Sequence, residues 1–251
     1  MKKYAIILFV VLLYLVISLG IGHIDSSSKK YIYIDTNVRW EYSNKKWNNI
    51  DRSNNIELKN YHVYAPYIDQ DQGKHDLRYI DGEWYIKETN DYVLYDNILL
   101  AYKANNKFKI YEYDREYEIS KSEITDILKK IGISGYSALS TSDKIKIDSN
   151  DDGDSEYFYI ISNMFSESNE SSYFSVVAYY SEGDYKIVKS TITKTDNLIN
   201  KTSFNIFAII DFDGDNNLEI IISEEKFSLL GNEYSLYGLD DGEYIELVSS
   251  Y

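Results

Sequence analysis

Two short acidic loops hold the residues of this chain that are best suited to chemistry. The first runs from Asp148 to Glu156 (DSNDDGDSE) and the second from Asp211 to Glu219 (DFDGDNNLE). Counted from its first Asp, each loop has an oxygen-bearing side chain at positions 1, 3, 5 and 9. Calcium is a hard cation that takes about six to eight oxygen ligands, often from flexible loops. The spacing therefore predicts one Ca²⁺ ion in each loop.

The predicted ligands follow from the winding of such a loop, in which odd-numbered positions point inward and water completes the coordination shell. Position 7 contributes its backbone carbonyl, and the other ligands are side chains. Position 6 must turn sharply with a positive φ, which Gly153 supplies in the first loop and Asn216 tolerates in the second. The predicted metal ligands are Asp148, Asn150, Asp152, Asp154 and Glu156 in the first loop, and Asp211, Asp213, Asp215, Asn217 and Glu219 in the second.

An ordinary exposed turn is the alternative interpretation of each loop. Asp, Asn and Gly are common in turns, and the chain has 41 acidic residues. Mg²⁺ fits these loops less well than Ca²⁺, because it demands a near-ideal octahedron. Both loops occupy the same register of an internal repeat, which favours calcium over an ordinary turn.

Each loop belongs to a longer unit that occurs twice, at residues 143–192 and 207–251. The order in each unit is strand, acidic loop, strand, strand, tight turn, strand. The loops start 63 residues apart (from 148 to 211), and the turn glycines, Gly183 and Gly242, are 59 residues apart. This order predicts a four-stranded antiparallel sheet in each unit.

The acidic loops resemble the short calcium loops of FG-GAP and VCBS-type repeats, which lie between strands of propeller blades such as those of integrin α chains. The shared string is Asp-x-Asp/Asn-x-Asp with an acid at position 9, followed by an apolar strand. The resemblance covers residues 143–251 and implies Ca²⁺ ligands at positions 1, 3, 5 and 9. The loops are not EF-hands, because position 12 is Tyr159 or Ile222 rather than Glu. Two units are too few to close an ordinary propeller, so we expect a packed sandwich or sheets that join the preceding strands.

The rest of the chain predicts a mostly β fold of antiparallel sheets with one amphipathic helix. Residues 31–118 form a β region, residues 119–132 a connecting helix, and 143–251 the repeat pair. Ser120 and Glu123 make a capping box, and the apolar residues that follow form one stripe, which predicts a helix at about 121–131 packed on a sheet. Strands are predicted at Tyr31–Ile34, Val38–Tyr42, Tyr61–Tyr64, Trp84–Lys87, Tyr92–Leu94, Ile98–Tyr102 and Phe108–Tyr113.

The N-terminal residues 1–24 are predicted to be a signal-anchor or transmembrane helix. Tyr4–Gly22 contains no charge and, as a helix, would rise about 28 Å, close to the thickness of a hydrocarbon core. Cleavage near Gly20, as a secretory signal, is the alternative. Lys2 and Lys3 favour an N-terminus in the cytoplasm, so residues 25–30 act as a polar tether and the C-terminal bulk is extracytoplasmic.

Composition excludes several classes of function. The net charge of −15 leaves no basic surface for nucleic acid. The absence of Cys excludes thiol catalysis, Cys-ligated zinc and disulfides, and the three His residues nearly exclude a multi-histidine site. His75 and Asp76, beside Asp71, are predicted to lie in a polar turn, with His75 solvated on the surface.

These features predict an exported, membrane-tethered, calcium-stabilised binding or interaction module of the cell surface, whose partner is a protein or a glycan. One alternative is a surface hydrolase that acts on glycans through paired carboxylates. Another is a structural accessory protein of the envelope. Trp40, Trp47 and Trp84 are candidates for stacking on sugar rings, and cross-strand packing is the competing explanation for them.

Overall fold

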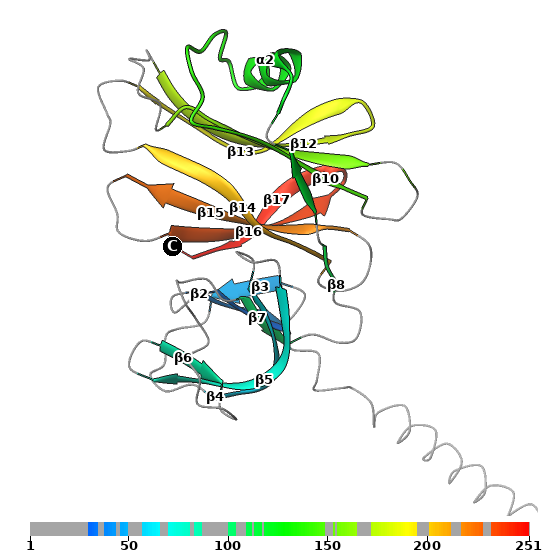
Figure 1. Cartoon of the computed structure of the whole chain (residues 1–251), viewed down its shortest axis with the longest axis vertical. Coiled ribbons are helices and arrows are strands. Elements are labelled where there is room, and N and C mark those ends of the chain that lie inside the picture. Colours follow the sequence, from blue (N-terminus) through cyan, green and yellow to red (C-terminus); the bar gives the residue numbers. More distant parts are fainter. Residues whose placement is uncertain are drawn as a thin grey trace, which may run out of the picture.

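The described residues fold into three antiparallel sheets that stack in a row, with the helix α2 over the last of them (Figure 1). The mostly β, antiparallel class predicted from the sequence is confirmed. The computed structural model describes residues 30–34, 38–43, 46–49, 57–65, 70–80, 83–86, 100–103, 109–111, 113–116, 118–148, 153, 155–164, 172–194, 201–211, 217–227 and 232–250.

The first sheet contains seven strands in the order β3-β2-β1-β7-β4-β5-β6. Neighbouring strands pair antiparallel, for example Ile32 with Trp40 between β1 and β2. The strands are β1 (Lys30–Ile34), β2 (Val38–Ser43), β3 (Lys46–Asn49), β4 (Glu57–Ala65), β5 (Gln70–Ile80), β6 (Glu83–Ile86) and β7 (Leu100–Lys103).

The other two sheets share one strand order. The central sheet runs β17-β16-β15-β14-β8, and the outer sheet runs β13-β12-β11-β10-β9. The central strands are β8 (Lys109–Ile110), β14 (Thr202–Asp211), β15 (Glu219–Lys226), β16 (Asn232–Asp240) and β17 (Glu243–Ser249). The outer strands are β9 (Asp114–Glu116), β10 (Thr141–Ile147), β11 (Glu156–Ser162), β12 (Ser172–Ser181) and β13 (Asp184–Lys194).

Among the described residues, three hydrophobic cores hold these layers together, and the central sheet contributes to two of them. Trp40 and Trp47 of the first sheet share a core with Leu236 of the central sheet. Phe158 of the outer sheet shares a second core with Ile222 of the central sheet. Because the central sheet is covered on both faces, its strands carry continuous apolar runs rather than alternating ones.

The helix α2 (Lys121–Lys130) covers the far face of the outer sheet and buries Ile124, Ile127 and Leu128 there. The predicted capping box is present. Ser120 Oγ accepts a hydrogen bond from Glu123 N (3.3 Å), and Glu123 Oε2 accepts one from Ser120 N (2.9 Å). The backbone N–H groups of Ser120 and Glu123, which have no partner within the helix, are both hydrogen-bonded in this way. This arrangement fixes where the helix begins.

One prediction about single residues is wrong, and the choice left open for the tryptophans is decided in favour of packing. His75 and Asp76 lie inside strand β5 rather than in a polar turn, because pairing with β4 and β6 overrides their polar composition. Trp40 (0% exposed) and Trp47 (8% exposed) lie in the core, so cross-strand packing explains them and sugar stacking does not. The side chain of Trp84 is not among those that the structure describes.

The predicted β region 31–118 is divided among the sheets. Its last strands leave the first sheet, because β8 pairs with β14 and β9 pairs with β10. The structure therefore joins β8 and β9 to the sheets of the repeat region, which is one of the two arrangements expected from the sequence.

The predicted N-terminal segment 1–24, most of the tether and the strand at Tyr92–Leu94 lie outside the described residues. Within the part of the chain that is described, no helix is both long enough and apolar enough to cross a membrane.

Candidate calcium loops

The first acidic loop closes between β10 and β11. Ile147 pairs with Glu156, so residues 148–155 form the connection. Gly153 has φ +89°, the positive value expected at position 6 of a calcium loop, and it is exposed. A side chain at this position would strain the backbone, so the loop needs glycine there.

Asp148 is the first predicted ligand and has one bonded and one free oxygen. Its Oδ2 accepts a hydrogen bond from Gly153 N (3.1 Å), which brings position 6 of the loop to the carboxylate of position 1. Its Oδ1 is buried and, in the described structure, has no hydrogen-bond partner. A buried carboxylate oxygen left without a partner costs free energy, and an absent ion or water is a usual explanation for one.

The second acidic loop closes in the same register. Ile210 pairs with Glu219, so residues 211–218 form the connection between β14 and β15. Asp211 is 2% exposed at the end of β14, and Leu218 (3% exposed) anchors the other end of the loop in the core. Asn217 is exposed and Glu219 half-buried.

Half of the predicted calcium ligands are not among the described residues. Asn150, Asp152, Asp154, Asp213 and Asp215 lie outside the described residues. Among the residues that are described, no group of three or more His, Cys, Asp or Glu side chains converges as a metal site. The structure thus places the two ends of each loop, and the convergence of the ligands stays a prediction.

The strand ends that border the two loops lie at one end of the stacked sheets, together with two tight turns (Figure 1). Both turns have positive φ at both central residues, 52° and 84° at Glu182-Gly183 and 47° and 76° at Asp241-Gly242. This type I′ geometry matches the twist of a hairpin. We call this end, with residues 148–155, 181–184, 211–218 and 240–243, the acidic end.

Three aromatic rings connect the two sheets beside the acidic end. The ring of Tyr244 lies 5.7 Å from Phe158 and 5.1 Å from Tyr179, both in edge-to-face contact. Lys186 of β13 also donates a hydrogen bond to the carbonyl of Gly242 (2.6 Å). The turn of the central sheet is therefore held against the outer sheet.

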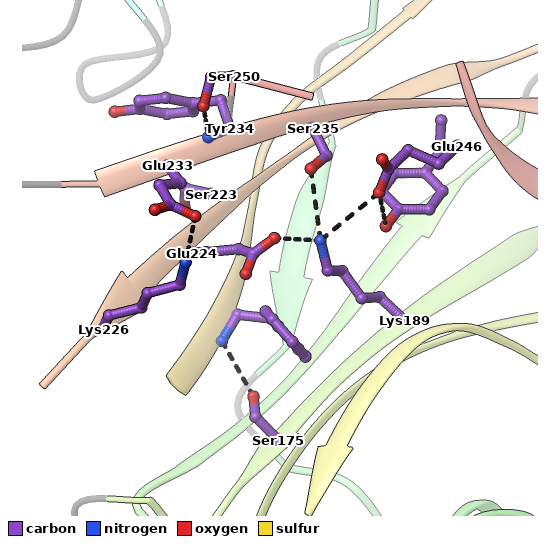
Figure 2. A network of polar contacts seen from close by, with 12 residues as sticks. Ser175, Lys189, Ser223, Glu224, Lys226, Glu233, Tyr234, Ser235, Glu246 and Ser250 are labelled. Atoms are coloured by element: carbon purple, nitrogen blue, oxygen red, sulfur yellow. Dashed lines mark hydrogen bonds and ion pairs between the residues drawn. The ribbon is translucent and has the colours of Figure 1, made fainter. Parts of the chain in front are cut away.

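A polar network lies deeper between the same two sheets (Figure 2). Lys189 of β13 forms an ion pair with Glu224 of β15, and its side chain is 14% exposed against 5% for Glu224. Lys189 Nζ also lies 3.3 Å from Ser235 Oγ and 3.9 Å from Glu246 Oε2. Two carboxylates thus approach one buried ammonium group from the central sheet.

This network is not arranged as a catalytic carboxylate pair. The Nζ of Lys189 is flanked by the rings of Phe204 (5.4 Å) and Tyr237 (5.5 Å), and the Glu224 residue is 4% exposed. The carboxylate of Glu224 faces a lysine in the interior rather than an open cleft. The network is arranged to hold the outer sheet against the central sheet.

A second buried polar cluster attaches α2 to the outer sheet. Glu123 accepts hydrogen bonds from the hydroxyl of Tyr159 (2.8 Å) and from Lys144 Nζ (3.1 Å). Partial burial acts to raise the pKa of Glu123, but the hydrogen bonds that its carboxylate accepts outweigh burial and lower the pKa to about 2. The carboxylate therefore stays charged at any ordinary pH and keeps the helix in register.

Sequence reasoning missed Lys189, Glu224 and Tyr244. Glu224 stands two residues after the apolar run Ile220–Ile222, and an acid so close to a buried strand is a signal that can be noticed. Tyr244 stands two residues after Gly242, as Tyr185 stands two residues after Gly183, so the repeat marks it as well.

Comparisons with protein-family models, with curated proteins and with solved structures find no match for this chain.

Proposed function

We propose that this chain is an exported, membrane-tethered binding or interaction module of the cell surface, stabilised by Ca²⁺ in two repeated loops. The observation that carries the calcium site is the unpartnered, buried Oδ1 of Asp148 in a loop whose Gly153 has the expected positive φ. A cation at that oxygen would satisfy it and would relieve repulsion among the acids of the loop.

Matching irregularities in the two units support the proposal that they are repeats of one another. Besides the matching loops and turns, β13 and β17 carry a bulge at the same place, opposite Val177/Ala178 and Leu236/Tyr237 respectively. These positions are 59 residues apart, like the turn glycines. Bulges at equivalent positions are typical of related units.

The stacking of the sheets supports a blade-like relation between the units. Phe158 and Val177, which face the central sheet, are equivalent to Ile221 and Leu236, which face the first sheet. Corresponding faces therefore point the same way, as in successive blades of a propeller, rather than toward each other. If another unit stacked in the same way, it would cover the far face of the outer sheet. The helix α2 covers that face instead.

Direct titration tests the calcium proposal. We expect the full extracytoplasmic chain to bind two Ca²⁺ ions with Kd on the order of 10⁻⁴–10⁻³ M, the range of extracellular modules. Asp152→Ala and Asp215→Ala should each remove one site, measured by isothermal titration calorimetry. A chain that takes up no calcium at millimolar concentrations would refute the proposal.

The location rests on the charge-free segment Tyr4–Gly22 behind Lys2 and Lys3. A reporter that works only in the cytoplasm should be inactive when fused after Tyr251, and an active fusion would exclude export. The intact mass of the mature chain then distinguishes an anchor from cleavage near Gly20. No feature of the described residues favours the glycan hydrolase over this proposal.

A further inference from the structure

Two unexplained polar atoms lie close to the first acidic loop. Among the described residues, three buried side-chain polar atoms have no hydrogen-bond partner: Trp40 Nε1, Asp148 Oδ1 and the hydroxyl of Tyr244. Trp40 belongs to the first sheet, whereas Asp148 belongs to the acidic end and Tyr244 lies directly beside it in β17. Native proteins leave few such atoms, so two at one end point to a missing group there.

Tyr244 comes from the central sheet but packs on the outer one. Its residue is 8% exposed, and its ring contacts Phe158 and Tyr179. Glu156, the position 9 ligand of the first loop, lies two residues before Phe158 in β11, so both side chains leave the strand on the same face. The hydroxyl of Tyr244 is therefore on the side of the sheet where the Glu156 carboxylate lies.

We propose that Tyr244 is a positioning residue for the calcium ion of the first loop. With the ion bound, its hydroxyl donates a hydrogen bond to the carboxylate of Glu156 and holds that carboxylate as a ligand. This inference rests on the proposed calcium site and adds that the site is shared between two sheets. Ion binding at the outer sheet then also ties the central sheet to it.

The electrostatics of Tyr244 agree with a donor role. Burial raises the pKa of its phenol well above the usual value, and Tyr179, Glu219 and Glu156 add to the rise. The phenol therefore remains protonated and has a proton to donate. Partners that orient metal ligands in this way typically contribute about 10–100-fold to metal affinity.

The test isolates one loop at a time. In an Asp215→Ala background, which disables the second loop, Tyr244→Phe should weaken Ca²⁺ binding about 10-fold in calorimetric titration of the extracytoplasmic chain. In an Asp152→Ala background, where the second loop alone binds, Tyr244→Phe should weaken binding by a smaller factor than in the first background. Equal affinity with and without the Tyr244 hydroxyl in the first background would overturn the inference.

Tyr185→Phe is the matched control, because Tyr185 holds the equivalent place after the other turn and packs toward α2. It should leave calcium affinity unchanged, and a loss equal to that of Tyr244→Phe would overturn the inference. In excess chelator, Tyr244→Phe should melt at the same temperature as the unmodified chain or slightly higher, because it removes an unpartnered polar group. A lower melting temperature in chelator would instead assign the hydroxyl a purely structural role. If the unmodified chain binds no calcium, the proposed function fails first and this inference fails with it.

Discussion

Replacing Lys189 with Met should lower the free energy of unfolding by about 3–5 kcal/mol. The change leaves Glu224, whose side chain is 5% exposed, as a buried carboxylate without its ammonium partner. A buried charge that loses its partner pays most of its desolvation cost without compensation. The loss should appear in chemical denaturation at neutral pH, and it should respond little to salt, because buried pairs are screened weakly.

The pair Lys226–Glu233 provides the control, because it is also a lysine–glutamate ion pair but lies within the central sheet, between β15 and β16. Its side chains are 29% and 25% exposed, so Lys226→Met should cost less than about 1 kcal/mol. The double variant Lys189→Met/Glu224→Met should recover much of the loss, since an apolar pair of similar volume removes both buried charges. If Lys189→Met costs no more than Lys226→Met, the buried network is not a major source of cohesion between the sheets.

The sequence could not reveal this network because a bulge reverses the side of the strand on which Lys189 lies. Val177 pairs with Lys189 but Ala178 pairs with Ile187, so Val188 is an extra residue in β13. In a regular strand Lys189 would share the face of Ile187, which packs toward α2. The bulge turns Lys189 toward the central sheet instead, and no pattern of alternation marks it.

Local features, by contrast, were predictable from the residues alone. The capping box of Ser120 and Glu123 depends on four consecutive residues, and the turns at Gly183 and Gly242 depend on two. The edge strands β8 and β9 depend on sheets formed much later in the chain, so the sequence predicts that preceding strands can join the repeat sheets but not which strands do so. The acidic loops fall between these cases: their closing pairs and Gly153 agree with the prediction, while the ligand set stays a prediction.

Removing calcium should lower the melting temperature of the chain by about 5–15 °C. At about 2 mM Ca²⁺ and a Kd near 10⁻⁴ M, each occupied loop adds roughly 1.8 kcal/mol by mass action, and two loops add about 3–4 kcal/mol. For a chain of this size, each 1 kcal/mol shifts the melting temperature by about 2–4 °C. The measurement is thermal unfolding in millimolar calcium and in excess chelator, and Mg²⁺ should restore the chelated protein poorly, because the loops offer no strict octahedron.

Two variants separate the ion from ordinary charge effects in the same melting experiment. Asp152→Ala and Asp215→Ala should each remove about half of the calcium response, because each deletes a ligand from one loop. In chelator, each should melt at the temperature of the unmodified chain or slightly above it, since one repelling carboxylate is gone. Glu118→Gln changes an exposed acid outside both loops and should keep the full calcium response. A melting curve that is the same in chelator and in millimolar calcium would show that the two loops are ordinary acidic turns.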